Sequence, residues 1–166
     1  LFQNAMLELS RHGAFQGQYT SVGARSILGV FQQVAIEVSK NGEVGEIATF
    51  DMMYAGISSS LAKFQSSIAS AERNLDYNPL AIKILKALFL VKYIKTFKAT
   101  LHNITVLMHS NFNENQVQFS QDIEEALNLL EKETYIQRTN DVYEFLTDKE
   151  QEIEQDIKKT EISTTD

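Results

Sequence analysis

Two short strings in this 166-residue sequence are similar to catalytic motifs, and each lacks the partners that its chemistry requires. Ser60-Leu61-Ala62-Lys63 matches S-x-x-K, but the S-D-N and K-T-G strings that accompany it in serine acylases are missing. Gly56-Ile57-Ser58 is half of a nucleophile elbow without the second glycine. An ordinary helix surface explains both strings better, so we predict no catalytic residue and rank a free-standing enzyme third among the function hypotheses.

The histidines and acidic residues predict no metal site and no cofactor in this chain. His102 and His109 lie seven residues apart, which separates them by roughly 10 Å along a helix axis, too far to chelate one ion. The chain has no cysteine, which excludes a disulfide framework, a thiolate metal site and a cysteine nucleophile. Nothing singles out two of the many carboxylates of the last third as an acid/base pair, so a solvated acidic face is favoured.

Arg25 is the residue best placed by sequence to contact a phosphate. It falls in the first turn of a predicted amphipathic helix, close to Gly23, where the backbone can approach a ligand closely. By residue type alone, a surface or structural arginine remains the more common role. Arg11 is a second candidate for a phosphate contact, with less support from the surrounding sequence.

Charge is distributed unevenly along the chain. The formal net charge is −7, from 15 Lys and Arg against 22 Asp and Glu, which excludes a uniformly basic nucleic-acid binder. Residues 77–110 carry no acid, whereas residues 111–166 are strongly acidic. Such asymmetry favours distinct surfaces with distinct partners. The bases of the acid-free segment are Lys83, Lys86, Lys92, Lys95 and Lys98.

Apolar spacing predicts a mainly α-helical chain. Helices are expected over residues 2–11, 21–41 and 50–74, the second capped by Ser21 and ended by Gly42 in a left-handed conformation. Asn78 and Pro79 predict the start of a helix that is apolar nearly all round and runs to about residue 95. The buried stripe expected for the second helix comprises Ile27, Phe31, Val34 and Val38.

The C-terminal half predicts two more helices, a hairpin and a final helix. One helix starts near Thr100, and Ser120 is expected to cap the next. Alternating runs at 135–139 and 142–146 flank Asn140-Asp141, a pair that tolerates a hairpin turn. A capping box at 147–150 starts the last helix, which is expected to end near residue 159 with Ile153 and Ile157 facing inward.

This order of elements is that of a winged helix. We therefore predict a helical subdomain over residues 1–76, a winged-helix domain with a small two-stranded β-hairpin over residues 77–160, and a frayed tail over residues 161–166.

Winged helices usually bind DNA through the third helix. Here that helix presents acids such as Glu124 and Glu125, which repel phosphates. If DNA binds, the plausible surface is Lys83–Lys98, with Arg138 at the wing. Lysine stems reaching out at the edges of a buried helix are the competing explanation.

Several strings resemble an internal part of the large P-loop ATPase of bacteriophage-exclusion (BREX) systems, which is similar to the ATPase of phage growth limitation systems. They are LSRHGAF (9–15), SVGARSIL (21–28), NPLAIKILKALFL (78–90), YIK (93–95), TYIQR (134–138) and YEFLT (143–147). The resemblance implies an AAA-type parent that binds ATP and Mg²⁺ and acts in phage defence beside a methyltransferase and other partners. It also implies a lid-like role for residues 1–76, with Arg25 as a sensor-2 arginine that contacts nucleotide. This chain contains no G-x-x-x-x-G-K-[ST] string and no Walker-B strand, so it is not expected to hydrolyse ATP itself.

The favoured hypothesis is a non-catalytic lid plus winged-helix module that contacts other domains of the parent ATPase or other phage-defence proteins. The alternative is a DNA-binding winged helix that uses the lysines of residues 83–98. The sequence starts with Leu1 rather than methionine, so we expect an excised piece of a longer protein. With no signal peptide and no apolar run of membrane-spanning length, a cytoplasmic location and no membrane partner are expected.

Overall fold

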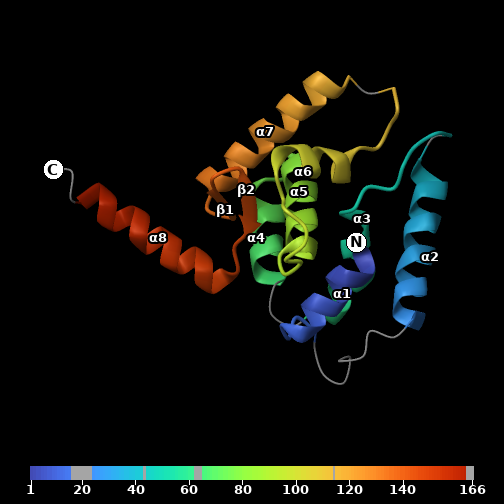
Figure 1. The fold of residues 1–166 in the computed structure, drawn as a ribbon, viewed down its shortest axis with the longest axis horizontal. Coiled ribbons are helices and arrows are strands. Elements are labelled where there is room, and N and C mark those ends of the chain that lie inside the picture. The colour runs from blue at the N-terminus through green and yellow to red at the C-terminus, as the bar shows by residue number, and fades with distance from the viewer. Residues whose placement is uncertain (16–23, 43, 62–64, 114, 164–166) are drawn as a thin grey trace.

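The computed structural model describes residues 1–15, 24–42, 44–61, 65–113 and 115–163. Over these residues the chain folds into eight α-helices, one short 3₁₀ helix and a two-stranded antiparallel sheet, so the predicted mainly α class with a hairpin is confirmed (Figure 1). None of the described helices combines the length and the apolar character needed to cross a membrane. The elements are α1 (Phe2–Arg11), α2 (Ala24–Asn41), α3 (Met52–Ile57), η1 (Ser58–Ser60), α4 (Gln65–Asn74), α5 (Pro79–Val91), α6 (Leu101–Met108), α7 (Gln116–Lys132), β1 (Ile136–Thr139), β2 (Val142–Phe145) and α8 (Asp148–Ser163).

Helix α5 is the central element of the core. The Asn78 side chain accepts a hydrogen bond from the Ala81 amide at 3.0 Å and Pro79 occupies the first turn, as predicted. Apolar residues surround the helix because α1, α3, α4, α6, α7 and β2 all pack against it. The helix ends at Val91, earlier than predicted. The buried residues of α1, α3 and α4 belong to the same core as those of α5–α7, and the predicted domain boundary after residue 76 stays a prediction.

The single helix predicted for residues 50–74 is wrong. The structure has α3, η1 and α4 instead, and Leu61 is extended and forms an isolated bridge with Phe15. The serine run explains the break, because the Ser58 hydroxyl donates to the Ala55 carbonyl at 3.1 Å and competes with the helical ladder. Ser60 is therefore not on an α-helix, and Lys63 lies outside the described residues.

Two expectations for α2 also need correction. Val30 and Val34 are buried, whereas Phe31 is 46% exposed, so the buried stripe is rotated from the predicted one. A Cβ on Gly56 would lie 2.8 Å from a methyl of Val30, so this glycine lets α3 approach α2 closely, and that contact selects the buried face. Gly42 does not have a left-handed φ; a Cβ there would lie 2.6 Å from the Val38 carbonyl oxygen, so close approach requires the glycine. The predicted cap Ser21 lies outside the described residues.

Helix α7 starts earlier than predicted. Asn115 caps it by accepting hydrogen bonds from the Val117 and Gln118 amides at 3.1 and 3.3 Å, so the predicted cap Ser120 lies inside the helix. The physical reason is that Asn caps as well as Ser, and the earlier start buries Phe119. The predicted core face is confirmed, and its residues are Ile123, Ala126, Leu127 and Leu130.

The hairpin forms as predicted, with Asn140 at a positive φ of 57°. Its register pairs Ile136 with Phe145 and Thr139 with Val142. A third segment joins the hairpin: the Tyr143 amide donates to the Ala99 carbonyl at 3.0 Å, and Thr100 forms an isolated bridge with Val142. The chain just before α6 therefore extends the sheet edge by a short strand-like contact.

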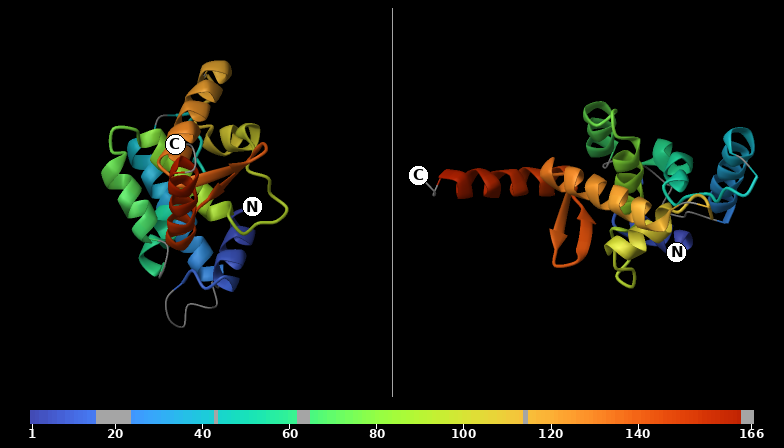
Figure 2. Two further views of the ribbon diagram at one scale, coloured as in Figure 1. Left: turned by 90° about the vertical axis from the view of Figure 1, so that its left-hand side faces the viewer. Right: turned by 90° about the horizontal axis from the view of Figure 1, so that it is seen from above.

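Helix α8 projects away from the rest of the molecule, as Figure 1 and the right view of Figure 2 show. Its capping box is confirmed: the Thr147 amide donates to Glu150 Oε2 at 2.7 Å, and the Glu150 amide donates to Thr147 Oγ1 at 3.4 Å. The predicted inner stripe is wrong, because Ile153 and Ile157 are 61% and 47% exposed. Beyond its first turns the helix leaves the core, so no element covers these isoleucines within the described part of the chain. The helix continues to Ser163, past the predicted end.

Candidate interaction surface

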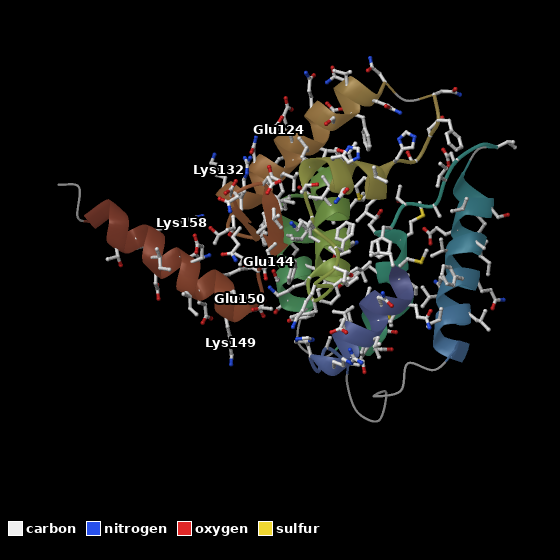
Figure 3. The ribbon with its side chains drawn as sticks, in the orientation of Figure 1. Glu124, Lys132, Glu144, Lys149, Glu150 and Lys158 are labelled. Carbon is white, nitrogen blue, oxygen red and sulfur yellow. The ribbon has the colours of Figure 1, made fainter. Side chains whose placement is uncertain are left out.

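The outward face of α7 is acidic. Among the described residues of this helix Lys132 is the only cation, and it lies in the last turn (Figure 3). Asp122 is half-buried and accepts a hydrogen bond from the Gln118 side chain at 2.9 Å. A face of this charge favours a basic partner over phosphates. The exposed residues of the face are Gln118, Gln121, Glu124, Glu125, Asn128 and Lys132, with Glu133 following the helix.

Lys158 ties α8 to the C-terminus of α7. Its Nζ donates to the Glu131 carbonyl at 3.3 Å and to Thr134 Oγ1 at 3.1 Å. Thr134 is buried and has a left-handed φ of 64° just past the end of α7. A cation beside the last carbonyls of a helix is favourable, because these carbonyls lack helical partners and carry the negative end of the dipole. Lys158 is therefore held in the structure rather than offered to a partner.

Lys92 ties α5 to both the hairpin and α8. Its Nζ donates to Glu144 of β2 at 3.0 Å, to the Phe145 carbonyl at 2.6 Å and to Glu150 of α8 at 3.0 Å. Only 3% of the Lys92 side chain is exposed. Figure 3 labels both carboxylates of this junction. We call Lys92, Glu144, Thr147 and Glu150 the Lys92 junction.

The junction stabilises the charged form of Glu150. Burial raises the pKa of this carboxyl, but the hydrogen bonds from the Thr147 amide, from Lys92 and from the Thr147 hydroxyl outweigh it, so the pKa is lowered from 4.5. The start of α8 is held further by α4, because Asp148 accepts a hydrogen bond from the Ser66 hydroxyl and the Gln151 side-chain Nε2 donates to the Ser67 hydroxyl. The same Gln151 Nε2 also donates to the Leu146 carbonyl at 3.0 Å. The first turns of α8 are thus fixed, and Lys158 holds the helix again further along, while Ile153 and Ile157 stay exposed.

The lysines predicted as a basic block do not form one surface. Lys83 is exposed and Lys86 pairs with Glu72 at 2.7 Å; both line a cavity beside α2. Lys95 and Lys98 are exposed and line a depression beside the hairpin, where the buried Lys92 also lies.

The predicted arginines are also accounted for. Arg138 at the wing donates to the Asn140 carbonyl at 2.9 Å and lies over the Tyr143 ring, 5.3 Å from its centroid. Arg25 lies in the first turn of α2 as predicted, but its side chain lies outside the described residues. Arg11 pairs with Glu8 at 2.6 Å. Within the described ranges, no three His, Asp or Glu side chains converge to hold a metal ion.

The structural roles of Lys92 and Lys158 were not predicted from the sequence. For Lys92 a signal exists: it lies seven, four and three residues after the buried Leu85, Leu88 and Phe89, so helical spacing places it on the buried face. For Lys158 no spacing in the sequence indicates a structural role, because its partners lie at the C-terminal end of α7.

No family model and no solved structure matches this chain. The relation to the phage-exclusion ATPase therefore stays a prediction.

Proposed function

We propose that this chain is a non-catalytic winged-helix module that acts through protein contacts made by α7 and α8. The order α5, α6, α7, hairpin and α8 supports a winged helix, as does the contact of Ala99 and Thr100 with β2, which corresponds to the short strand between the first two helices of such domains. In this arrangement α7 is the third helix and the hairpin is the wing.

One observation carries the choice of partner: the exposed face of α7 is acidic while Lys92, at the centre of the basic segment, is buried. DNA affinity depends on neutralising phosphates with Lys and Arg. The third helix offers Lys132, near its C-terminus, against Glu124 and Glu125. A basic protein surface, or a neighbouring domain of the parent, complements this face better.

The proposed parent is the large P-loop ATPase of a phage-exclusion system, and the support is the sequence resemblance. In that parent, residues 1–76 would act as a lid and Arg25 would contact ATP bound with Mg²⁺. ATP hydrolysis is assigned to the rest of the parent, because the Walker motifs are not in this sequence.

The test against DNA is a fluorescence anisotropy titration of a labelled duplex of about 30 base pairs at about 150 mM salt. We expect no saturable binding by the chain. A dissociation constant below about 1 µM that weakens steeply with salt would overturn the proposal.

Docking is tested by hydrogen–deuterium exchange in the proposed parent ATPase. We expect the amides of α7 and α8 to exchange more slowly there than in the 166-residue chain. Equal exchange rates in the two proteins would contradict docking on a neighbouring domain.

The DNA-binding alternative retains one supporting observation, the exposure of Lys95 and Lys98 beside the hairpin. Because Lys92 holds the Lys92 junction, a variant that changes it would confuse lost binding with lost folding. The suitable variant is Lys95→Glu with Lys98→Glu. A large loss of DNA affinity in this variant would favour the alternative.

A further inference from the structure

A second feature, independent of the interaction surface, is a cavity of about 540 Å³ beside α2, α3 and α5. Its volume falls in the range of small-molecule sites. Apolar side chains such as Val34, Leu80 and Met108 line part of it, and Thr49 and Asp51 bring polar atoms to its lining. Pockets that bind small molecules share this pattern of apolar walls with a few polar groups.

Two polar residues of this cavity, Thr49 and Asp51, are buried and each has a side-chain oxygen without a hydrogen-bond partner among the described residues. Asp51 is 7% exposed and Thr49 is 3% exposed. Among the described residues, neither Asp51 Oδ1 nor Thr49 Oγ1 has a hydrogen-bond partner. Asp51 precedes α3, but its side chain does not cap that helix. Buried polar atoms in native proteins are nearly always partnered, so these two point to a missing donor.

The charges around the cavity indicate what kind of donor fits. A carboxylate only accepts hydrogen bonds, and Glu37 and Glu46 add two more carboxylates to the lining. Of the two lysines that line it, Lys86 pairs with Glu72 at 2.7 Å. The carboxylates therefore outnumber the available cations. As no three acidic or histidine side chains in the described ranges converge on a metal position, an organic cation fits this lining better than a metal ion.

We propose that this cavity binds a small organic cation, a primary ammonium or guanidinium, whose N–H groups donate to Asp51 Oδ1 and Thr49 Oγ1. The apolar walls hold the hydrocarbon part of the ligand. Charge-assisted hydrogen bonds to a buried carboxylate provide both affinity and orientation. Burial raises the pKa of Asp51, and the nearby Thr49 hydroxyl, Lys83 and Lys86 only partly offset this rise. The Thr49 hydroxyl lies close enough to lower this pKa but forms no hydrogen bond of ordinary geometry with Asp51 Oδ1. A bound cation would restore the charged form of Asp51.

The test is isothermal titration calorimetry of the 166-residue chain with agmatine and n-butylamine, and with n-butyrate as the anionic control. We expect saturable binding of at least one cation with one site per chain and no binding of butyrate. Asp51→Asn should weaken the cation's affinity by about tenfold or more, while Glu125→Gln, an equal change of charge on α7, should leave it unchanged. Thr49→Val should weaken it less, because it removes the weaker acceptor.

Circular dichroism of each variant shows whether it folds. If Asp51→Asn does not fold, the affinity of Thr49→Val still tests the proposal. No saturable binding of either cation would overturn the proposal. Equal affinities in all the variants, or tighter binding of butyrate than of the cations, would also overturn it.

Discussion

The Lys92 junction and the Asp51 cavity each hold a carboxyl group, and their surroundings shift its pKa in opposite directions. Glu150 is half-buried, whereas Asp51 is buried. Glu150 accepts hydrogen bonds from Thr147 and Lys92, and its pKa is lowered. Asp51 Oδ1 has no partner among the described residues, and burial raises the pKa of this carboxyl. The difference separates two uses of polar groups: satisfied ones fix the fold, whereas an unsatisfied one marks a place where a ligand can bind.

The largest expected effect comes from removing the shared donor of the junction. Lys92→Met should lower the free energy of unfolding by about 1 to 2 kcal/mol, mainly because it leaves the Phe145 carbonyl without its donor. Glu144 and Glu150 also lose their donor, but their side chains are 47% and 43% exposed, so water replaces much of that interaction. Urea unfolding followed by circular dichroism measures it. The matched control is Lys95→Met, an exposed lysine, with an expected change within about 0.5 kcal/mol. Equal losses in the two variants would contradict a structural role for Lys92.

The next effect has the opposite sign and concerns the cavity. Asp51→Asn should raise the free energy of unfolding by about 1 kcal/mol at pH 7 without ligand, because it removes an unpartnered buried charge. Urea unfolding of this variant beside Glu125→Gln measures the difference. A destabilised Asp51→Asn protein would show that the carboxylate is satisfied and structural.

The pH dependence of stability sharpens the same comparison. Glu150 has a lowered pKa, so its contribution is present above the unfolded value of 4.5 and is lost as pH falls through the folded pKa. Glu150→Gln should therefore cost roughly 0.5 kcal/mol at pH 7, because 43% of this side chain is exposed and water screens the interaction. This cost should shrink below pH 4.5. Asp51 has a raised pKa, so stability is highest below its unfolded value of 3.8 and falls as pH rises through the folded pKa. Unfolding curves across this pH range, with each variant beside the unchanged chain, separate the two contributions.

The smallest expected effect on stability comes from the exposed stripe of α8. Ile153→Ser with Ile157→Ser should change the free energy of unfolding by less than about 0.5 kcal/mol, because both side chains lie in solvent. The control Ile123→Ala, at a fully buried position of α7, should cost about 3 kcal/mol. A loss of similar size in the α8 variant would mean that these isoleucines pack against the body, as the sequence spacing suggested.

Features set by local chemistry could be predicted from the sequence. Asn78-Pro79, the hairpin turn at Asn140 and the capping box at Thr147 all form as expected, because each depends on residues within a few positions. The core face of α7 was predicted for the same reason. Helical periodicity reports which side of a helix is apolar, and that information is local.

Features that depend on contacts between distant segments could not be predicted. The inward direction expected for Ile153 fails because spacing does not say whether any element lies opposite the helix. The Nζ atoms of Lys92 and Lys158 form hydrogen bonds with residues of other elements. Helical periodicity indicates that Lys92 lies on a buried face, but it gives no such indication for Lys158. Thr49 and Asp51 lie in a loop, where no spacing indicates that both become buried at one cavity.

The contrast between the two carboxyl groups is measured most directly by a ¹³C NMR titration of the side-chain carboxyls in the ligand-free chain. We expect the pKa of Asp51 to lie above its ordinary value of 3.8 and that of Glu150 to lie below its ordinary value of 4.5. A lowered pKa at Asp51 together with a raised pKa at Glu150 would contradict the separation of a structural junction from an open binding site.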